Sequence, residues 1–116
     1  MIARKVKQLE VLSCEPKQRR FETPLLFVHG AFAGAWVWDE HFLPYFAAQG
    51  YSAHAISLRG HGGSEGHERI DWYSIHDYVD DVTEVIRDLG AAPVLVGHSM
   101  GGFVVQKYLE RHQVPA

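Results

Sequence analysis

The sequence predicts an α/β fold with a doubly wound, mostly parallel sheet. Short apolar runs without polar alternation recur along the chain, and such runs are typical of strands buried on both faces of a parallel sheet. Helical patterns separate them, giving the order strand, strand, helix, strand, helix, strand, helix. The 116 residues, 47% hydrophobic and 22% charged, suit one globular domain, and no repeat or linker interrupts them.

The first two expected strands precede any helix. Short apolar alternation and β-branched content predict a strand over Val6 to Cys14, and the polar stretch from Glu15 to Thr23 predicts a loop. Pro24 then opens the continuous apolar run Leu25 to Val28, which predicts a buried strand.

A turn, a helix and a strand are expected next. The small residues from Gly30 to Gly34 must turn the chain. Asp39 through Gln49 fits a helix that ends before Gly50, and Tyr51 to Leu58 fits a strand. One face of this helix would carry Phe42, Leu43, Phe46 and Ala47.

The strongest helix signal follows a loop that begins at Arg59 and continues irregularly to about Tyr73. Ser74 is a good N-cap, Asp77 lies in the first turn, and Gly90 closes the segment. Apolar residues recur at helical spacing between these limits, namely Ile75, Tyr78, Val79, Val82, Val85, Ile86 and Leu89. A third buried strand is expected at Val94 to Val96, and another helix from about Met100 to His112.

The charge is modest overall but uneven. A net charge of −3 and a pI near 6.2 argue against a global attraction to nucleic acid or anionic membranes, and no metal or cofactor is expected. The start of the chain is basic, whereas a later stretch is acidic and contains Asp71, Asp77, Asp80, Asp81, Glu84 and Asp88. These stretches are either two solvated surfaces or a docking patch.

The single cysteine, Cys14, excludes an intrachain disulfide, and a reducing compartment is the default. Met1 to Glu10 contain no apolar run like that of a signal peptide, and no stretch approaches the length of a membrane span. We therefore expect a cytoplasmic location.

The sharpest chemical signal is Gly97-His98-Ser99-Met100-Gly101, which matches G-x-S-x-G between a buried strand and a helix. A nucleophile on this turn needs small residues two positions before and after it, so that strand and helix can approach closely. Gly97 and Gly101 meet that need, and Gly102 gives further room. Ser99 is therefore the predicted nucleophile, although a serine before a helix can also be a simple N-cap.

The second signal is His29-Gly30-Ala31-Phe32, directly after the first buried strand. Attack by a serine creates an oxyanion that needs two backbone donors, one from the residue after the nucleophile and one from this loop. Met100 and Ala31 are the predicted donors, with Phe32 the less favoured choice for the second. We expect His29 to hold the loop by hydrogen bonds and not to act as the base.

Three segments together resemble the N-terminal landmarks of the α/β-hydrolase family: Leu26-Phe27-Val28-His29-Gly30, Arg59-Gly60-His61-Gly62-Gly63-Ser64 and Gly97-His98-Ser99-Met100-Gly101-Gly102. The resemblance extends over nearly the whole chain from Pro24. It implies the N-terminal half of an α/β-hydrolase core, with Ser99 as nucleophile and Ala31 and Met100 in the oxyanion hole. It also implies an Asp or Glu and then a His on later strands and loops.

The chain departs from this pattern after the nucleophile. Only Glu110 and His112 follow Ser99 as an acid and a histidine, and both lie near the far end of the expected helix, roughly 15 Å away by helical rise. The family's N-terminal hairpin is also reduced to one clear strand in the sequence pattern. We therefore expect residues 1–116 to be a partial α/β-hydrolase domain, truncated before the acid and histidine of the triad.

Other candidate sites are weaker. The Gly62-Gly63 pair suggests a phosphate loop only superficially, because neither nucleotide-binding glycine pattern is present, so this loop more plausibly shapes the wall of the site. The eight histidines show no metal-ligand spacing. Aromatic residues near the loops either line a substrate pocket or simply pack, namely Phe32, Trp36, Trp38 and Trp72.

The expected function is hydrolysis of a small acyl substrate through an acyl-serine intermediate without a cofactor, and a carboxylic ester is the best single choice. The fold also serves lyases, acyltransferases and cofactor-free haloperoxidases, so the reaction subtype stays open. The alternative is a non-catalytic truncated protein that binds a small molecule or a partner. Oligomeric state is left open.

Overall fold

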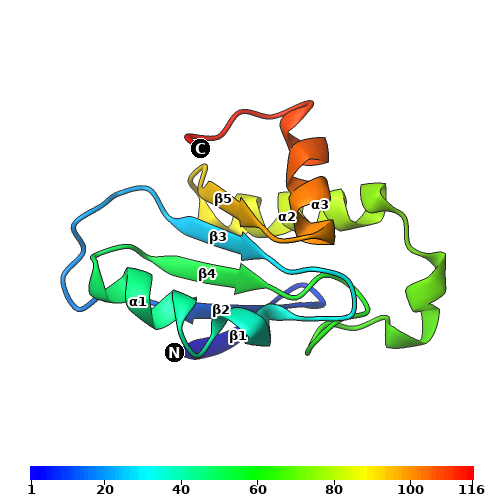
Figure 1. The fold of residues 1–116 in the computed structure, drawn as a ribbon, viewed down its shortest axis with the longest axis horizontal. Coiled ribbons are helices and arrows are strands. Elements are labelled where there is room, and N and C mark those ends of the chain that lie inside the picture. The colour runs from blue at the N-terminus through cyan, green and yellow to red at the C-terminus, as the bar shows by residue number, and fades with distance from the viewer.

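The computed structural model describes residues 1–116 as a five-stranded mixed sheet with helices on both faces (Figure 1). The strands are β1 (Ile2–Val6), β2 (Leu9–Cys14), β3 (Leu25–Val28), β4 (Ala53–Ile56) and β5 (Val94–Gly97), in the spatial order β1-β2-β4-β3-β5. β4, β3 and β5 are parallel, whereas β1 and β2 are antiparallel to their neighbours. The predicted doubly wound, mostly parallel fold is thus confirmed.

The N-terminal hairpin is present, so the prediction of a single strand over Val6 to Cys14 was wrong. β1 and β2 pair from Ile2 with Ser13 to Val6 with Leu9, and Lys7 and Gln8 form the connection. Lys7 has a φ of 54°, a left-handed conformation that glycine or asparagine usually adopts in such turns. Without either residue, the sequence lacks the usual hairpin signal.

Each face of the sheet has its own apolar core. On one face, 3₁₀-helix η1 (Ala35–Trp38) and α1 (Phe42–Ala48) pack with Phe27, Leu43 and Trp38. On the other, α2 (Ile75–Leu89) and α3 (Met100–Leu109) pack with Leu26, Val28 and Ile56. Figure 1 shows α1 in front of the sheet and α2 behind it. This two-sided covering explains why β3 and β5 have no polar side chains.

The predicted helix from Asp39 to Gln49 is shorter in the structure, because η1 and a turn occupy the residues before Phe42. Leu43 and Ala47 of its expected apolar face are buried, but Phe42 is 46% exposed. Tyr51 to Leu58 contains the shorter strand β4, and the loop before Tyr73 contains 3₁₀-helix η2 (His67–Trp72). α3 ends at Leu109, three residues before the expected end.

Helix α2 begins and ends where the sequence predicts. The Ser74 side chain accepts a hydrogen bond from the Asp77 backbone N–H, and the Asp77 carboxylate accepts one from the Ser74 N–H. Gly90 ends the helix with a left-handed φ of 76°. Both termini are therefore satisfied by local side-chain and backbone geometry, as in a capping box.

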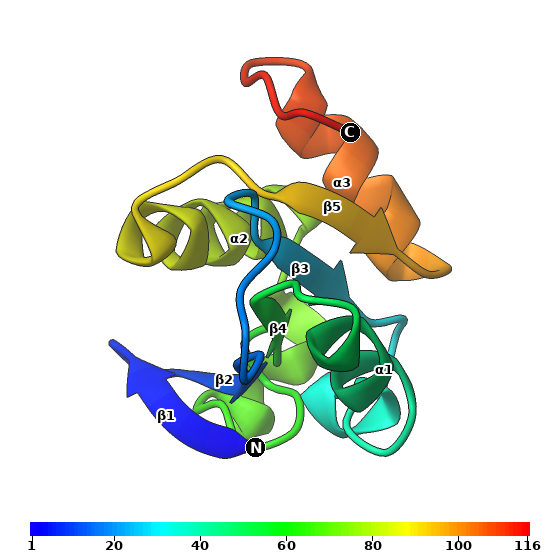
Figure 2. The ribbon, with the colours of Figure 1, turned by 90° about the vertical axis from the view of Figure 1, so that its left-hand side faces the viewer.

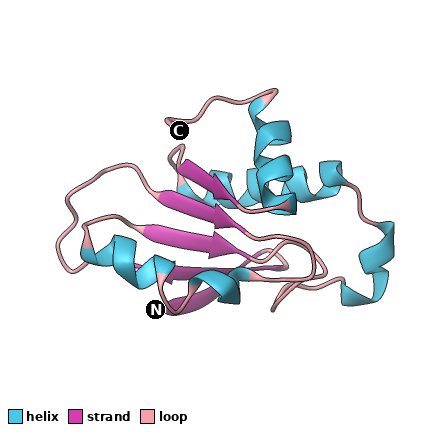
Figure 3. Ribbon diagram, viewed as in Figure 1, coloured by secondary structure: helices cyan, strands magenta, loops and turns pink.

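The register of the parallel strands brings two loops together. Val28 at the end of β3 lies opposite Gly97 at the end of β5, so the segments after these residues leave the same edge of the sheet. Figure 3 shows the three parallel arrows pointing the same way, with loops emerging beyond their tips. This is the edge where ligands bind in open α/β folds.

The outer edge of β5 is partly covered. The Leu95 backbone N–H donates to the Ala116 carbonyl at 2.9 Å, and Val114 packs against the α2–α3 core. Figure 2 shows the C-terminal segment returning from α3 toward β5. No helix in the structure is long and apolar enough to cross a membrane.

Candidate active site

Ser99 lies between β5 and α3 in a strained conformation. Its φ and ψ are 57° and −121°, a region that side-chain-bearing residues rarely adopt. The residue occupies the N-cap position of α3 but makes no side-chain capping bond, and it is exposed. The strained turn therefore presents the Ser99 hydroxyl to solvent at the carboxyl edge of the sheet, and does not use it to cap the helix.

Two glycines allow this turn to form. A Cβ on Gly101 would overlap the carbonyl oxygen of Val28 and lie 2.5 Å from that of His29. A Cβ on Gly97 would lie 2.6 Å from the Gly101 carbonyl oxygen. Side chains at either position would force α3 away from β3 and β5. At Gly102, by contrast, a Cβ would meet nothing closer than 3.6 Å.

The loop after β3 reaches Ser99 at Gly30. A Cβ on Gly30 would lie 3.2 Å from the Ser99 Cβ and 3.6 Å from Nδ1 of the exposed His98. Gly30 opens a turn in which the Ala33 N–H donates to its carbonyl at 3.3 Å, and Phe32 has a φ of 61° in that turn. The loop and the nucleophile turn are thus in direct contact.

The predicted oxyanion donors Ala31 and Met100 lie in the two segments that meet where Gly30 approaches Ser99. Ala31 is the exposed second residue of the Gly30 turn, and Met100 is the first residue of α3. Neither backbone N–H donates to another backbone group. Both amides therefore remain available to a bound oxygen, although the same holds for the amide of Phe32.

His29 is completely buried and uses both ring nitrogens. Its Nε2 accepts from the Leu58 backbone N–H at 3.0 Å, so Nδ1 carries the proton and donates to the Gly30 carbonyl at 2.7 Å. Burial lowers the pKa of His29 to about 4, the Gly30 bond opposes that shift, and nearby His61 adds to it. A neutral, doubly bonded imidazole supports the loop and has no free nitrogen for a proton from Ser99.

Glu110 and His112 lie beyond the far end of α3. Glu110 pairs with Lys107 at 3.2 Å, and the His112 ring stacks on Tyr108 with centroids 4.3 Å apart. No hydrogen bond joins either side chain to the Ser99 turn. The structure therefore does not bring a second triad member to Ser99 from these two residues.

The loop from Arg59 to Ser64 is held in place by side chains of other segments. The space beside Gly62 and Gly63 is filled by Ser57 and Glu10, as a Cβ on either glycine would meet these side chains. Arg59 is fixed by the buried Asp81, with its Nε 3.0 Å from Oδ1. Burial raises the pKa of the Asp81 carboxyl, and the hydrogen bonds from Arg59 oppose that shift.

The four aromatic candidates divide into two groups. Trp38 is buried and its ring packs against Phe27, with centroids 5.0 Å apart, so it is a core residue. Phe32, Trp36 and Trp72 are exposed by 80%, 58% and 85% respectively, which leaves them available to a ligand or another part of the protein.

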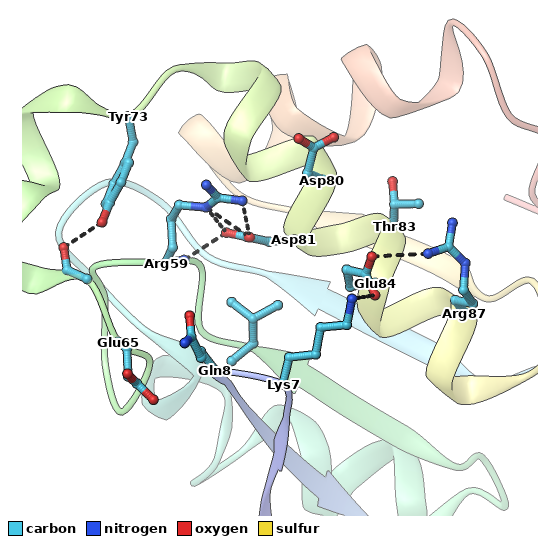
Figure 4. A pocket seen from close by; sticks show the side chains of 12 residues that line it. Lys7, Gln8, Arg59, Glu65, Tyr73, Asp80, Asp81, Thr83, Glu84 and Arg87 are labelled. Carbon is cyan, nitrogen blue, oxygen red and sulfur yellow. Dashed lines mark hydrogen bonds and ion pairs between the residues drawn. The ribbon is translucent and has the colours of Figure 1, made fainter.

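Part of the uneven charge of the sequence is paired across the fold. Arg4 pairs with Asp88 at 2.7 Å, and Lys7 pairs with Glu84 at 3.1 Å, so the basic N-terminus faces the acidic helix α2. Figure 4 shows Lys7, Glu84, Arg87, Arg59 and Asp81 paired around a pocket of about 510 Å³. No group of three histidine, cysteine or acidic side chains is placed to hold a metal ion.

Sequence reasoning missed one residue that touches the loop. The buried Ser57 follows β4, and its Oγ accepts a hydrogen bond from the Ala35 backbone N–H at 2.9 Å. Ser57 and Ala35 are separated by 22 residues, and no local motif links them.

Comparison with known proteins agrees with the geometry. A family model described as the alpha/beta hydrolase fold matches residues 23–116. Epoxide hydrolase 3 of Xenopus tropicalis is 37% identical over 90 residues, which are 77% of this chain and 24% of that protein. Methyl jasmonate esterase 1 of Vitis vinifera is 31% identical over 99 residues, 84% of this chain and 36% of that protein. Non-heme haloperoxidases match over similar stretches.

The solved structures lead to the same family. A probable hydrolytic enzyme from Pseudomonas aeruginosa superposes with a TM-score of 0.78 and 27% identity, over 91% of this chain and 34% of that one. The chain thus spans about a quarter to a third of the length of the relatives it matches.

Proposed function

Because the chain belongs to the α/β-hydrolase family, we propose that it carries the nucleophile and oxyanion loop of a serine hydrolase that acts on a carboxylic ester or a related acyl substrate. The observation that carries this proposal is the strained Ser99 turn, which contacts the Gly30 loop. The Ser99 oxygen would attack the acyl carbon, and the N–H groups of Ala31 and Met100 would donate to the resulting oxyanion.

The identity of the nucleophile discriminates among the reactions of the relatives. Attack by a serine hydroxyl on an epoxide carbon would form an ether, which water does not readily cleave, so the enzyme would remain alkylated. Attack on the acyl carbon of an ester breaks its bond to the alcohol, which leaves, and forms an ester with Ser99; water then hydrolyses this ester to release the carboxylic acid and regenerate Ser99. A serine at position 99 therefore favours acyl substrates over epoxides, although epoxide hydrolases are among the relatives.

The reaction also needs a base for the Ser99 proton. His29 has both nitrogens occupied, and His112 stacks on Tyr108 beyond the end of α3. We therefore propose that the acid and histidine belong to sequence outside residues 1–116, and that these residues alone are inactive. A small neutral substrate and a cytoplasmic location are part of the same proposal. The rival proposal is a non-catalytic binding protein, and it is favoured by the fact that no histidine is hydrogen-bonded to the Ser99 hydroxyl.

A covalent probe tests the assignment of Ser99. In the protein that contains these residues together with its base, a fluorophosphonate should modify Ser99, because an activated serine is far more nucleophilic than an ordinary hydroxyl. Peptide mass spectrometry locates the modification, and Ser99→Ala should abolish it.

Ser64 provides the matched control. It lies in a neighbouring loop, but it is buried and its Oγ is bonded to the Glu10 N–H and the Ser57 carbonyl. Ser64→Ala should leave labelling intact. Modification of another serine, or labelling that disappears only in Ser64→Ala, would overturn the assignment.

A further inference from the structure

Glu10 and Ser57 form a hydrogen-bonded connection from strand β2 to the oxyanion loop. Glu10 Oε1 accepts from Ser57 Oγ at 2.8 Å, and Ser57 Oγ in turn accepts from the Ala35 backbone N–H at 2.9 Å. A serine hydroxyl has a single proton. Because that proton points to the Glu10 carboxylate, a lone pair of Ser57 is left facing Ala35.

The carboxylate itself is held firmly. Glu10 Oε1 also accepts from the Gly63 backbone N–H at 2.9 Å, and the Glu10 backbone N–H donates to Ser64 Oγ at 2.8 Å. Side chains at Gly62 or Gly63 would collide with Ser57 or Glu10. Glycine is therefore needed at both positions because the Glu10–Ser57 contact packs against them. This packing explains the glycine pair without a phosphate ligand.

The far end of this connection fixes one end of the Gly30 loop. The loop begins at Gly30, whose carbonyl accepts a hydrogen bond from His29. It ends at Ala35, the first residue of η1. His29 is anchored to the Leu58 N–H, and Ala35 is anchored to Ser57 Oγ. Two adjacent residues after β4 thus hold both ends of the segment that contains Ala31.

We propose that Glu10 is a positioning residue that acts through Ser57 and Ala35 to set the oxyanion loop, and this inference rests on the proposed acyl hydrolysis. Charge-assisted bonds are stronger than neutral ones, and bonds in a chain polarise one another. An ionised Glu10 therefore strengthens the Ser57–Ala35 bond. Small displacements of an oxyanion donor reduce transition-state stabilisation more than they reduce substrate binding.

The test measures kcat and KM in the full-length protein, with kcat expressed per Ser99 labelled by the fluorophosphonate. Glu10→Ala should lower kcat about tenfold and change KM less than twofold, whereas Glu10→Gln, which keeps an acceptor oxygen but not the charge, should recover part of the loss. Ser57→Ala should resemble Glu10→Ala. The double variant should be little worse than either, because both remove the same connection.

Ser13→Ala is the matched control, since Ser13 is a buried hydroxyl on the same strand that bonds to His54 and not to the loop. It should lower stability without lowering kcat per labelled site. Hydrogen exchange of the Ala35 amide gives a second readout that does not depend on turnover, and it should accelerate at least tenfold in Glu10→Ala.

Two results would overturn the inference by different routes. Ser99-dependent turnover that stays within twofold in Glu10→Ala and Ser57→Ala, or an unchanged Ala35 exchange rate, would exclude the positioning role alone. Turnover that survives Ser99→Ala would overturn the proposed function, and the positioning role with it. If Ser57→Ala fails to fold, the comparison of Glu10→Ala with Glu10→Gln decides.

Discussion

Ala31 offers a direct test of the oxyanion loop at the scale of one residue. It occupies the second position of the Gly30 turn, where proline is favoured. Ala31→Pro should therefore keep the turn but remove the backbone N–H. Loss of one oxyanion donor typically lowers turnover by about 10²-fold or more. We expect that loss in kcat of the complete enzyme. Unchanged turnover with an unchanged circular dichroism spectrum would transfer the donor role to Phe32.

His29 predicts an acid dependence of stability. Its pKa is about 4 in the folded chain, below the ordinary value of 6.5, so the unfolded chain binds the proton first as pH falls. Above pH 6.5 the neutral His29 makes its full contribution to the free energy of unfolding. This contribution, about 3 kcal/mol, is lost as the pH falls from 6.5 to about 4. Denaturant unfolding at pH 7 and pH 5 should show about 2 kcal/mol of this loss.

Variants separate His29 from the other histidines. His29→Gln should lower stability at pH 7 and flatten the pH dependence, while the exposed His41→Gln should leave it unchanged. Burial also lowers the pKa of His54, so part of the slope should persist in His29→Gln. An equal slope in wild type and His29→Gln would show that His29 is not buried in its neutral form.

At the scale of elements, two adjacent glycines in α3 have opposite roles. A methyl group at Gly101 would press on the Val28 and His29 carbonyls of the neighbouring segment, whereas one at Gly102 would make only ordinary contact with the Gly97 carbonyl, 3.6 Å away. Gly101→Ala should destabilise the protein by about 2 kcal/mol or more. Gly102→Ala should be neutral or stabilising by up to about 1 kcal/mol, because alanine favours the helix. Denaturant midpoints of the pair measure the contrast, and equal values would contradict the close approach of α3 to β3.

Elements were predictable from sequence where local chemistry determines them. Helix α2 carries its own capping box and its own glycine stop, so both ends were located correctly. The β1–β2 hairpin was missed because Lys7 adopts a positive φ that its residue type does not signal. Helix α1 was extended too far because a 3₁₀ turn precedes it, and the local pattern does not separate the two.

At the scale of the whole molecule, the strained Ser99 turn could be located from sequence because its two glycines and its serine lie within five consecutive residues. The connection from Glu10 to Ser57 could not, because the two residues are 47 positions apart and meet only through sheet pairing. The same applies to the ion pair between Arg4 and Asp88, which joins the basic start of the chain to the acidic helix α2. Contacts of this kind depend on the topology of the sheet, and no local residue spacing predicts them.

The last prediction concerns residues 1–116 expressed alone, which we expect to be inactive. Without an imidazole to accept its proton, Ser99 stays a neutral alcohol. An oxyanion hole and binding then supply only a residual acceleration, on the order of 10³–10⁴ over water. A p-nitrophenyl ester assay of this chain and its Ser99→Ala variant should therefore give equal rates.

The same chain should associate with itself. Phe103 and Leu109 on α3 are exposed by 58% and 43%, and Val94 and Val96 of β5 are only half-buried. The Leu95–Ala116 hydrogen bond covers one point of the β5 edge, so the remaining edge groups can still pair with another chain. Size-exclusion chromatography should show a minor monomer fraction. A soluble monomer with Ser99-dependent turnover equal to that of an intact esterase would mean that these residues contain a base, and it would refute the proposal that the histidine lies elsewhere.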